Sequence, residues 1–317
     1  MIVTVTLNAA IDRTLLVPNF QLGQRHRASA GFQTAGGKGV NVARALKRLG
    51  APVVATGLAG GRTGTLLVEE LTAEGILNDF VRIREESRTS TAVLDPTSNA
   101  YTEINEWGPE IGEDELEFLL EKLAYLSQRA EFVVFAGSLP RGVDPGLYGE
   151  LIHDANRRNL LTVLDAEGDA LRLGVEAEPY LVSPNVSEAE ALVGHEFVDD
   201  DDLATGLDEV AELGARNVLI TLDTGCYALL REERAEARLR ASAPEVEAVS
   251  TVGAGDTLLA GFIAARTAGR SFEEAVRAAV AAGTASVLEA GPGRFDPREA
   301  SRLTPLVSLE KLEQVAS

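Results

Sequence analysis

The sequence Thr251-Val252-Gly253-Ala254-Gly255-Asp256-Thr257 runs directly into the apolar stretch Leu258-Leu259-Ala260-Gly261-Phe262. Two glycines and an alanine leave backbone N–H groups uncovered at the start of a predicted helix, where the helix dipole favours an anion. A carboxylate at the mouth of such a site repels the anion, so Asp256 needs a reason to be there. It has one if it accepts the proton of a hydroxyl that attacks a bound phosphorus. The simpler alternative is a tight glycine turn with Asp256 as an ordinary helix-start residue.

The composition describes a globular and strongly acidic protein. The chain has 317 residues, of which 45% are hydrophobic, and its formal net charge is −20. A chain of this length can bury a sizeable core, and so acidic a chain is a poor general binder of nucleic acid or anionic membranes. The single cysteine, Cys226, excludes an internal disulfide and suits a reducing compartment. The N-terminus lacks a basic region, and no segment approaches the roughly 20 apolar residues of a membrane span, so we expect a cytoplasmic protein.

A second glycine-rich motif, Gly36-Gly37-Lys38-Gly39-Val40-Asn41, contains one of only four lysines in the chain. Its glycines allow the backbone and a ligand to approach closely, and a helix with Val42 and Leu46 on one face is predicted to follow. The spacing differs from that of a Walker A loop, and no Ser or Thr follows the lysine. The alternative is a flexible turn, but Lys38 and Asn41 add donors that a plain turn does not need.

Strands and helices alternate along most of the chain, which implies a parallel sheet with helices on both faces. We find no internal repeat and no linker, so we expect a single α/β domain over 1–317. Ligands of such sheets lie beyond the carboxyl ends of strands, which makes Asp12 a site candidate because it follows the first strand. The expected strands are 2–7, 52–58, 80–84, 132–136, 161–164, 180–182 and 217–222, with a hairpin at 227–240. The expected helices are 65–74, 113–128, 145–157, 203–213, 256–268, 272–289 and one that carries Glu188 and Glu190.

Two stretches, at about 13–35 and 88–107, break this alternation. They contain short strand-like pieces and a turn at 96–99, without a convincing helix. A small sheet of this kind, inserted in an alternating chain, is typical of a lid over a ligand site. Such a sheet cannot bury both of its faces, so we expect a homodimer through the lids. The apolar side chains that need cover are Leu15, Val17, Phe20, Phe32, Val93, Ile104 and Trp107.

The two glycine motifs, in this order and spacing, resemble the ribokinase/PfkB carbohydrate kinase family along nearly the whole chain. The resemblance implies a three-layer α/β/α fold with a mainly parallel central sheet and a small β-sheet lid. The segments 6–12, 137–140 and 250–253 are similar to the branch that acts on sugar phosphates. The implied activity is ATP- and Mg²⁺-dependent phosphorylation of a primary hydroxyl of a ketohexose monophosphate. Within that branch fructose 1-phosphate ranks first as the substrate, ahead of tagatose 6-phosphate and fructose 6-phosphate.

The resemblance also implies individual roles. Asp256 would be the general base, and Gly253, Ala254 and Gly255 would stabilise charge on the transferring phosphoryl oxygens. Glu188 would organise Mg²⁺ through water. Residues implied to hold the sugar and its phosphate are Asp12, Gly37, Lys38, Asn41, Arg88 and Ser138, with Arg25 and Arg27 either assisting from the lid or remaining exposed lid charges. Residues implied to contact the nucleotide are Asn185, Thr221, Asp223, Gly225, Cys226 and Gly283.

Departures from the family pattern and rival functions bear on this interpretation. Asp223 and Cys226 stand where the family usually has glycines, so the nucleotide loop is expected to differ. Ser250 stands where kinases of free sugars often have aspartate, and together with Arg88 it favours a phosphosugar over a free sugar or nucleoside. A catalytically silent sugar-phosphate sensor is the alternative from another class, and the intact Asp256 motif argues against it. The lack of a G-x-G-x-x-G after the first strand argues against a dinucleotide-dependent oxidoreductase.

Overall fold

The first strand, β1 (Ile2–Thr6), is buried along its whole length. Its sequence, IVTVT, places β-branched side chains on both faces, which is the pattern of a strand covered on both sides. It pairs in parallel with β4 (Val53–Gly60) on one side and with β8 (Phe132–Ala136) on the other. The strand therefore lies in the interior of a parallel sheet, as its sequence predicts.

The computed structural model describes residues 1–98, 100–232 and 235–313. The turn expected at 96–99, the centre of the hairpin expected at 227–240 and the end of the domain expected over 1–317 therefore fall partly outside the described residues. Within the described part of the chain, no helix is long and apolar enough to cross a membrane.

The central sheet has ten strands in the order β14-β13-β12-β11-β10-β9-β8-β1-β4-β5. Neighbouring strands from β5 to β11 are all parallel, whereas those from β11 to β14 pair antiparallel. This arrangement confirms the mainly parallel sheet expected from the sequence. The strands not yet given are β5 (Leu77–Ile83), β9 (Leu161–Asp165), β10 (Leu181–Val182), β11 (Val218–Leu222), β12 (Gly225–Glu232), β13 (Ala235–Ser242) and β14 (Ser308–Lys311).

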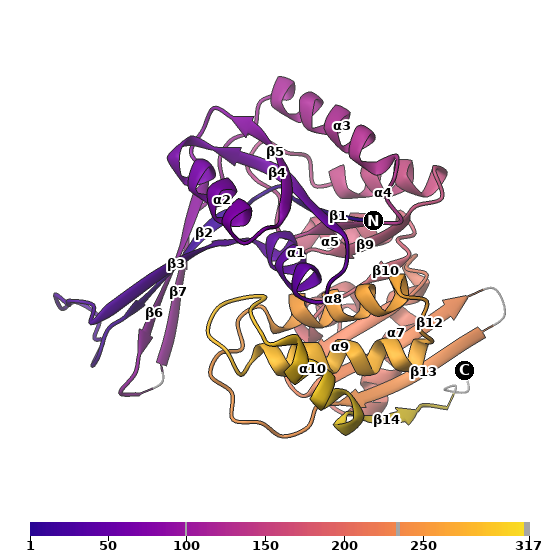
Figure 1. The fold of residues 1–317 in the computed structure, drawn as a ribbon. Coiled ribbons are helices and arrows are strands. Elements are labelled where there is room, and N and C mark those ends of the chain that lie inside the picture. The colour runs from indigo at the N-terminus through magenta and orange to yellow at the C-terminus, as the bar shows by residue number, and fades with distance from the viewer. Residues whose placement is uncertain (99, 233–234, 314–317) are drawn as a thin grey trace.

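Helices cover both faces of this sheet (Figure 1), and each face has its own apolar core. One face carries α1 (Lys38–Arg48), α2 (Gly61–Ala73), α8 (Ala254–Thr267), α9 (Phe272–Ser286) and α10 (Pro297–Leu303), which a 3₁₀ turn (Thr304–Leu306) follows. The other face carries α3 (Glu113–Ser127), α4 (Leu147–Arg157), α5 (Gly168–Val175), α6 (Val186–Val193) and α7 (Asp200–Glu212).

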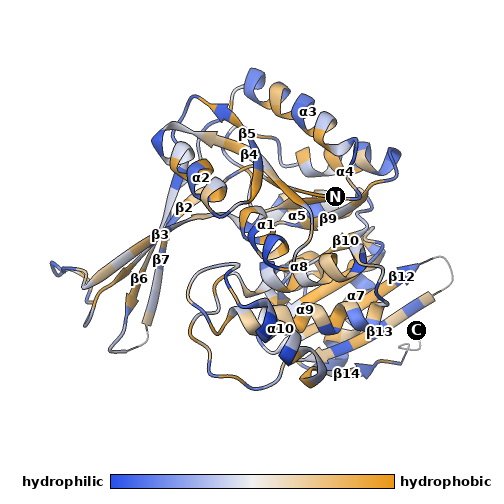
Figure 2. Ribbon diagram, viewed as in Figure 1, coloured by the Kyte–Doolittle hydropathy of each residue, from blue (hydrophilic) through white to orange (hydrophobic). Residues whose placement is uncertain are grey.

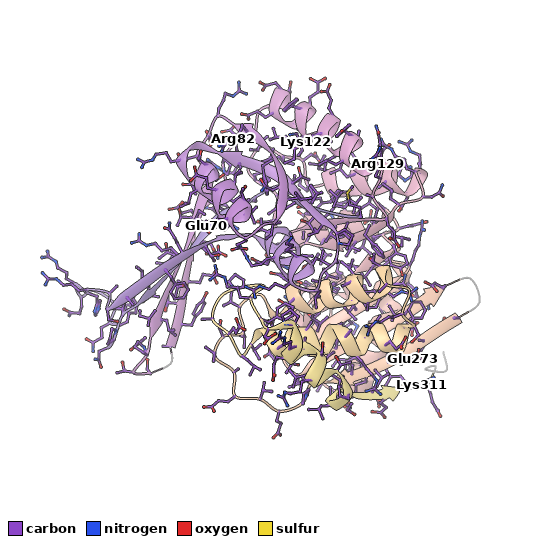
Figure 3. All side chains as sticks on the ribbon, in the orientation of Figure 1. Glu70, Arg82, Lys122, Arg129, Glu273 and Lys311 are labelled. Atoms are coloured by element: carbon purple, nitrogen blue, oxygen red, sulfur yellow. The ribbon has the colours of Figure 1, made fainter. Side chains whose placement is uncertain are left out.

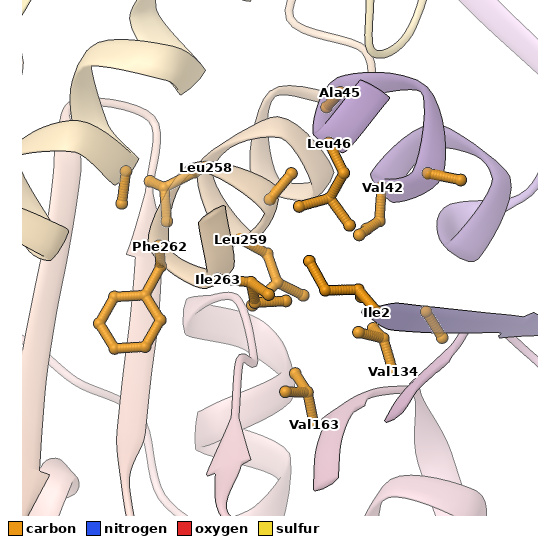
Figure 4. Close-up of a cluster of buried hydrophobic side chains, with 14 of the residues drawn as sticks. Ile2, Val42, Ala45, Leu46, Val134, Val163, Leu258, Leu259, Phe262 and Ile263 are labelled. Atoms are coloured by element: carbon orange, nitrogen blue, oxygen red, sulfur yellow. The ribbon is translucent and has the colours of Figure 1, made fainter. Parts of the chain in front are cut away.

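Apolar residues concentrate in the central strands and on the sheet-facing sides of the helices (Figure 2). Charged side chains such as Arg82 and Arg129 project from the outside of the molecule (Figure 3). In the core on the face that carries α1 and α8, Val42 and Leu46 lie close to Ile2 and to α8 (Figure 4). The separation of apolar and charged residues accounts for the three-layer arrangement, because each element buries its own apolar face.

A second sheet forms the predicted lid. Its order is β3-β2-β6-β7, and it projects away from the body of the molecule (Figure 1). The lid strands are β2 (Ala10–Leu16), β3 (Ala30–Gly36), β6 (Arg88–Asp95) and β7 (Ala100–Asn105), so the lid begins nearer to β1 than the sequence indicated. Phe32, Ile104 and Trp107 are 44%, 60% and 88% exposed, as expected of an uncovered face. Val17 and Val93, in contrast, are already buried within the chain, so the expectation that a second subunit must cover them is wrong.

The structure also differs from several of the expected elements. Helix α2 begins at Gly61 rather than Thr65, one turn earlier than expected. Helices α5 and α10 and strand β14 were not expected at all. Helix α5 is short and has glycines near both ends, so it lacks an apolar pattern long enough to be recognised.

Candidate active site

The motif around Asp256 forms the start of α8 and opens into a cavity. Gly253 is left-handed (φ 77°), and a Cβ added there would lie 2.6 Å from Pro292 Cβ, so only glycine suits this turn. A Cβ added at Gly255 would meet no atom within 4 Å, and Gly255 lines the cavity. The first turn of a helix leaves N–H groups without intrahelical acceptors. The start of α8 therefore presents amides and the positive end of its dipole to the cavity.

Asp256 is buried, with 7% of its surface exposed. Its Oδ2 accepts a hydrogen bond of 2.8 Å from Asn41 Nδ2, which comes from the glycine motif at the other end of the chain. Burial, followed by the charge of Asp165, raises the pKa of Asp256 to about 7, whereas Lys38 and Asn41 act in the opposite direction. A carboxylate with a pKa near neutrality is well matched to accept a proton from a hydroxyl group.

Lys38 links the first glycine motif to the carboxyl end of β9 and to α6. Its Nζ lies 2.7 Å from Asp165 Oδ1 and 3.3 Å from Glu188 Oε1. Burial alone would lower the pKa of Lys38, but the two carboxylates outweigh it and raise that pKa, so the ammonium group stays charged. Asp165 was not among the site residues expected from the sequence. Its position at the carboxyl end of β9 is the same signal that identified Asp12 after β1.

A second polar group surrounds Asp12 at the base of the lid. A Cβ added at Gly36 would lie 2.0 Å from Asp12 Oδ2, so this carboxylate packs directly against the glycine motif. Burial raises the pKa of Asp12 to about 6, and Arg88 opposes that rise. Arg88 Nε donates to the Asn8 carbonyl oxygen at 3.2 Å, and Asn8 Nδ2 donates to Ser138 Oγ at 3.1 Å. The structure thus links Arg88 and Ser138 through Asn8, which was not expected to take part in the site.

A cavity of about 530 Å³ adjoins the start of α8. This volume lies within the usual range for small-molecule and cofactor sites. The expected site residues that line it are Lys38, Asn185, Glu188, Thr221, Asp223, Gly225, Gly253, Ala254, Gly255, Asp256 and Gly283. The glycine motif and the nucleotide residues therefore meet in one cavity, although they come from opposite ends of the chain.

Three expected site residues lie away from both this cavity and the polar group around Asp12. Cys226 is 1% exposed within the apolar core, and burial raises the pKa of its thiol to about 12. It does not line the cavity, which corrects its expected contact with the nucleotide, because the alternation of β12 turns its side chain inward. Arg25 and Arg27 are exposed in the connection between β2 and β3, at the outer end of the lid, so the structure does not bring them to Asp256 (Figure 1).

A lidded, mainly parallel α/β sheet, with a buried carboxylate facing an anion site at a helix start, is the architecture of a ribokinase-like small-molecule kinase. The chain belongs to the PfkB family of carbohydrate kinases, because the profile described as "pfkB family carbohydrate kinase" matches residues 3–298. The protein is thus a phosphotransferase that acts on a sugar hydroxyl.

Individual relatives support this assignment. The chain is 34% identical over 315 residues to a 1-phosphofructokinase of Rhodobacter capsulatus, covering 99% of both chains. It is 33% identical to a 1-phosphofructokinase of Borreliella burgdorferi, covering 91% of this chain and 92% of that one. Among solved structures, Escherichia coli phosphofructokinase-2 in complex with fructose 6-phosphate superposes with a TM-score of 0.87 at 28% identity, covering 96% and 98% of the two chains. Another structure of that enzyme is described as its tetrameric inhibited form.

Proposed function

We propose that the protein uses ATP and Mg²⁺ to phosphorylate the free primary hydroxyl of a ketohexose monophosphate, and that fructose 1-phosphate is its preferred substrate. The observation that carries the proposal is the buried Asp256 carboxylate beside the start of α8. The substrate hydroxyl gives its proton to Asp256 while its oxygen forms a bond to the γ-phosphorus of ATP. The bond from that phosphorus to the bridging oxygen breaks, and ADP leaves with the electron pair.

The start of α8 supplies the electrostatic part of this reaction. The backbone N–H groups of Gly255 and Asp256 would face the position where charge develops on the transferring phosphoryl oxygens and would need no reorganisation during the reaction, whereas the Ala254 N–H already donates to Thr251 O at 3.2 Å. Lys38 also lines the cavity and adds a fixed positive charge to it. Most of the rate enhancement would thus come from positioning and charge stabilisation, with proton transfer to Asp256 as a further contribution.

The residues in the cavity fit a hydrated magnesium ion. Mg²⁺ is usually held by one or two carboxylates together with substrate phosphates, and it keeps several waters. Asp165 and Glu188 supply two such carboxylates within reach of Lys38, and Asn185 lies beside Glu188, whose Oε2 accepts from the Asn185 backbone N–H. We propose that these residues hold the ion, with Glu188 acting through water. The ion would neutralise charge on the nucleotide phosphates.

Two observations support a phosphosugar rather than a free sugar. Arg88 lies at the base of the lid, close enough to Asp12 to lower its pKa. A guanidinium group is well suited to bind the phosphate already present on the sugar. The two curated relatives reported above are named 1-phosphofructokinase, and for this reason we rank fructose 1-phosphate ahead of tagatose 6-phosphate and fructose 6-phosphate.

The assembly and location are also part of the proposal. The exposed apolar side chains Phe32, Ile104 and Trp107 lie on or next to the lid and support a homodimer formed through the lids. In such a dimer Arg25 and Arg27, at the outer end of one lid, could reach the site of the other subunit. The single buried thiol, Cys226, suits a reducing compartment and therefore supports a cytoplasmic location.

A coupled ADP-release assay tests the proposed function. It compares fructose 1-phosphate, fructose 6-phosphate, tagatose 6-phosphate, fructose and ribose at equal concentrations, with and without Mg²⁺. We expect the highest kcat/KM for fructose 1-phosphate and negligible turnover without the metal ion. Free fructose or ribose outcompeting every phosphosugar would contradict the proposed substrate class. Binding of a phosphosugar without ADP release would favour the silent sensor instead.

The same assay tests the role of Asp256. Asp256→Asn should retain the fold and sugar binding but lower kcat by about 10²–10⁴-fold, the usual contribution of a general base. A variant that kept nearly full kcat would show that Asp256 is not the base.

A further inference from the structure

Arg44, which the sequence analysis did not single out, is the largest side chain that is completely enclosed, with 1% of its surface exposed. It lies on α1 one turn after Asn41. A guanidinium group has five N–H donors and no acceptor. All five find partners here, and the acceptors are Glu74 Oε2 at 2.6 Å, Ala35 O at 2.7 Å, Asn41 Oδ1 at 3.2 Å, Pro292 O at 3.2 Å and Thr34 Oγ1 at 3.5 Å.

The contact with Asn41 fixes the orientation of a side-chain amide. Because Arg44 can only donate, Asn41 must turn its oxygen toward Arg44 and its NH₂ group toward Asp256. The reversed amide would place N–H against N–H on one side and oxygen against carboxylate on the other. Arg44 therefore donates to the oxygen of the Asn41 amide, and Asp256 accepts from the nitrogen of the same amide.

This orientation affects the protonation of Asp256. An NH₂ group can only donate, so it favours the carboxylate over the protonated acid and opposes the effect of burial on the Asp256 pKa. We propose that Arg44 is a positioning residue: it locks the Asn41 amide and thereby keeps Asp256 ionised and ready to accept a proton. The inference rests on the proposed function, in which Asp256 is the base.

Other charged groups must be considered before a pH effect is assigned to this route. Asp256 is influenced by Asp165 from the end of β9, Lys38 from the start of α1 and Asp12 from β2, and Lys38 also contacts Glu188 from α6. The charged groups around Arg44 are Glu74, which caps the C-terminal end of α2, Arg294 of the C-terminal loop between α9 and α10, which contacts Glu74, and Glu70 of α2, which accepts from the Ala35 N–H. Glu70 lies where α2 meets the base of the lid (Figure 3). Arg44 also lowers the pKa of Asp12, so an effect through Asp12 has to be separated from one through Asn41.

The experiment measures the acidic limb of kcat/KM against pH for wild type and Arg44→Met. Without Arg44 the Asn41 amide can reverse and offer its oxygen to Asp256, which stabilises the protonated acid. Losing a hydrogen bond to a charged group corresponds to a pKa change of about one to two units. We therefore expect the limb to move up by about one to two pH units, and activity to recover when the pH is raised above the new limb. A loss of folded enzyme that is the same at every pH lowers kcat/KM uniformly and leaves the limb in place, and circular dichroism across the pH range checks that the folded fraction is constant.

Arg48→Met is the matched control. Arg48 lies one turn further along α1 and holds the same C-terminal loop, because its Nη1 donates to Phe295 O at 2.9 Å. Its hydrogen bond goes to that loop and leaves the Asn41 amide locked by Arg44, so its loss should leave the limb in place. An equal shift in Arg48→Met, or an unshifted limb in Arg44→Met, would overturn the inference. Where Arg44→Met alone does not fold, adding Glu74→Gln removes the carboxylate left without its partner and gives the same readout.

A double-mutant cycle identifies the route. In an Asn41→Ala background, Arg44→Met should add almost no further shift, because the amide through which it acts is gone. A shift that persists there would mean that Arg44 acts through its own charge or through Asp12, contrary to the inference. Asp256→Asn separates this outcome from the proposed function. If that variant is active, the assignment of the base fails. If it is inactive and the Arg44→Met limb is unshifted, only the positioning role fails.

Discussion

Replacing glycine by alanine at two positions of α8 should change the stability of the protein in opposite directions, and this contrast tests the proposed anion site at the start of that helix. At Gly255 an added Cβ meets no atom within 4 Å, whereas at Gly261 it would lie 2.9 Å from Ala278 O, Ala279 Cα and Ala282 Cβ. Gly255→Ala should therefore raise the free energy of unfolding by about 0.4–1 kcal/mol, because alanine restricts the unfolded chain and fits the helix. Gly261→Ala should lower it by about 1–3 kcal/mol through overpacking against α9.

Activity should change in the reverse order. The open space at Gly255 is the cavity, so the new methyl group would hold phosphoryl oxygens away from the amides at the start of α8. Losing one such donor lowers kcat by about 10²–10³-fold. Gly261 lies two turns further along the helix, against α9, so Gly261→Ala should keep the wild-type kcat for each folded molecule.

Chemical denaturation gives the free energies of unfolding, and the coupled ADP-release assay gives kcat, with both made in the same buffer and salt. The decisive result is a Gly255→Ala protein that is at least as stable as wild type and nearly inactive. Full activity in that variant would refute the anion site at the start of α8. A loss of activity that tracked instability in both variants would show that α8 contributes only to folding.

Further predictions follow from the charges of the site and of the whole chain. Because Asp256 must be ionised and burial raises its pKa to about 7, kcat/KM should fall as the pH drops through about 7 and level off above it; a flat profile from pH 5 to 8 would contradict this. Arg88→Ala should lower kcat/KM for fructose 1-phosphate by roughly 10–150-fold, the equivalent of about 1.5–3 kcal/mol, while activity on free fructose stays almost unchanged; equal losses on both would remove Arg88 from phosphate binding. Light scattering at micromolar concentration should give the mass of a dimer, and Trp107→Glu should shift it toward the monomer; a monomeric wild type with and without sugar phosphate would exclude assembly through the lids. Thermal unfolding should move to higher temperature as KCl is added, because salt screens the repulsion within a chain of net charge −20; a midpoint independent of salt would show that the charges are already balanced locally.

Much of the fold could be predicted because local pattern and final environment agree. Strand β8 was expected at 132–136 and occupies Phe132–Ala136, since a short apolar run between polar segments suits a buried parallel strand. Strand β14 could not be predicted in the same way. It lies at the edge of the sheet and is defined by its pairing with β13, which no local pattern of its four residues reveals. Helix α10 did carry a signal, because Asp296 caps it and Pro297 occupies its first turn.

The site divides along similar lines. The two glycine motifs could be recognised from the sequence, because glycines at this spacing allow a close approach of backbone and ligand. The structure brings both motifs to one cavity. The role of Arg44 could not be predicted. An arginine on a helix usually extends into water, and part of what encloses it here is the C-terminal loop, nearly 250 residues away in sequence, which offers the carbonyl of Pro292. Burial that depends on so distant a contact leaves no trace in the local sequence.

Helix α1 explains why the two motifs have to occur together. Lys38, Asn41 and Arg44 follow one another at a spacing of three residues, so they form a polar stripe along one side of the helix. A separate stripe of α1, with Val42 and Leu46, enters the apolar core that also holds Leu259 of α8 (Figure 4). Because both stripes belong to one rigid helix, the packing that joins α1 to α8 also fixes the distance from Asn41 to Asp256. Any change that tilts α1 on the core should therefore disturb the contact between Asn41 and Asp256 before it unfolds the protein.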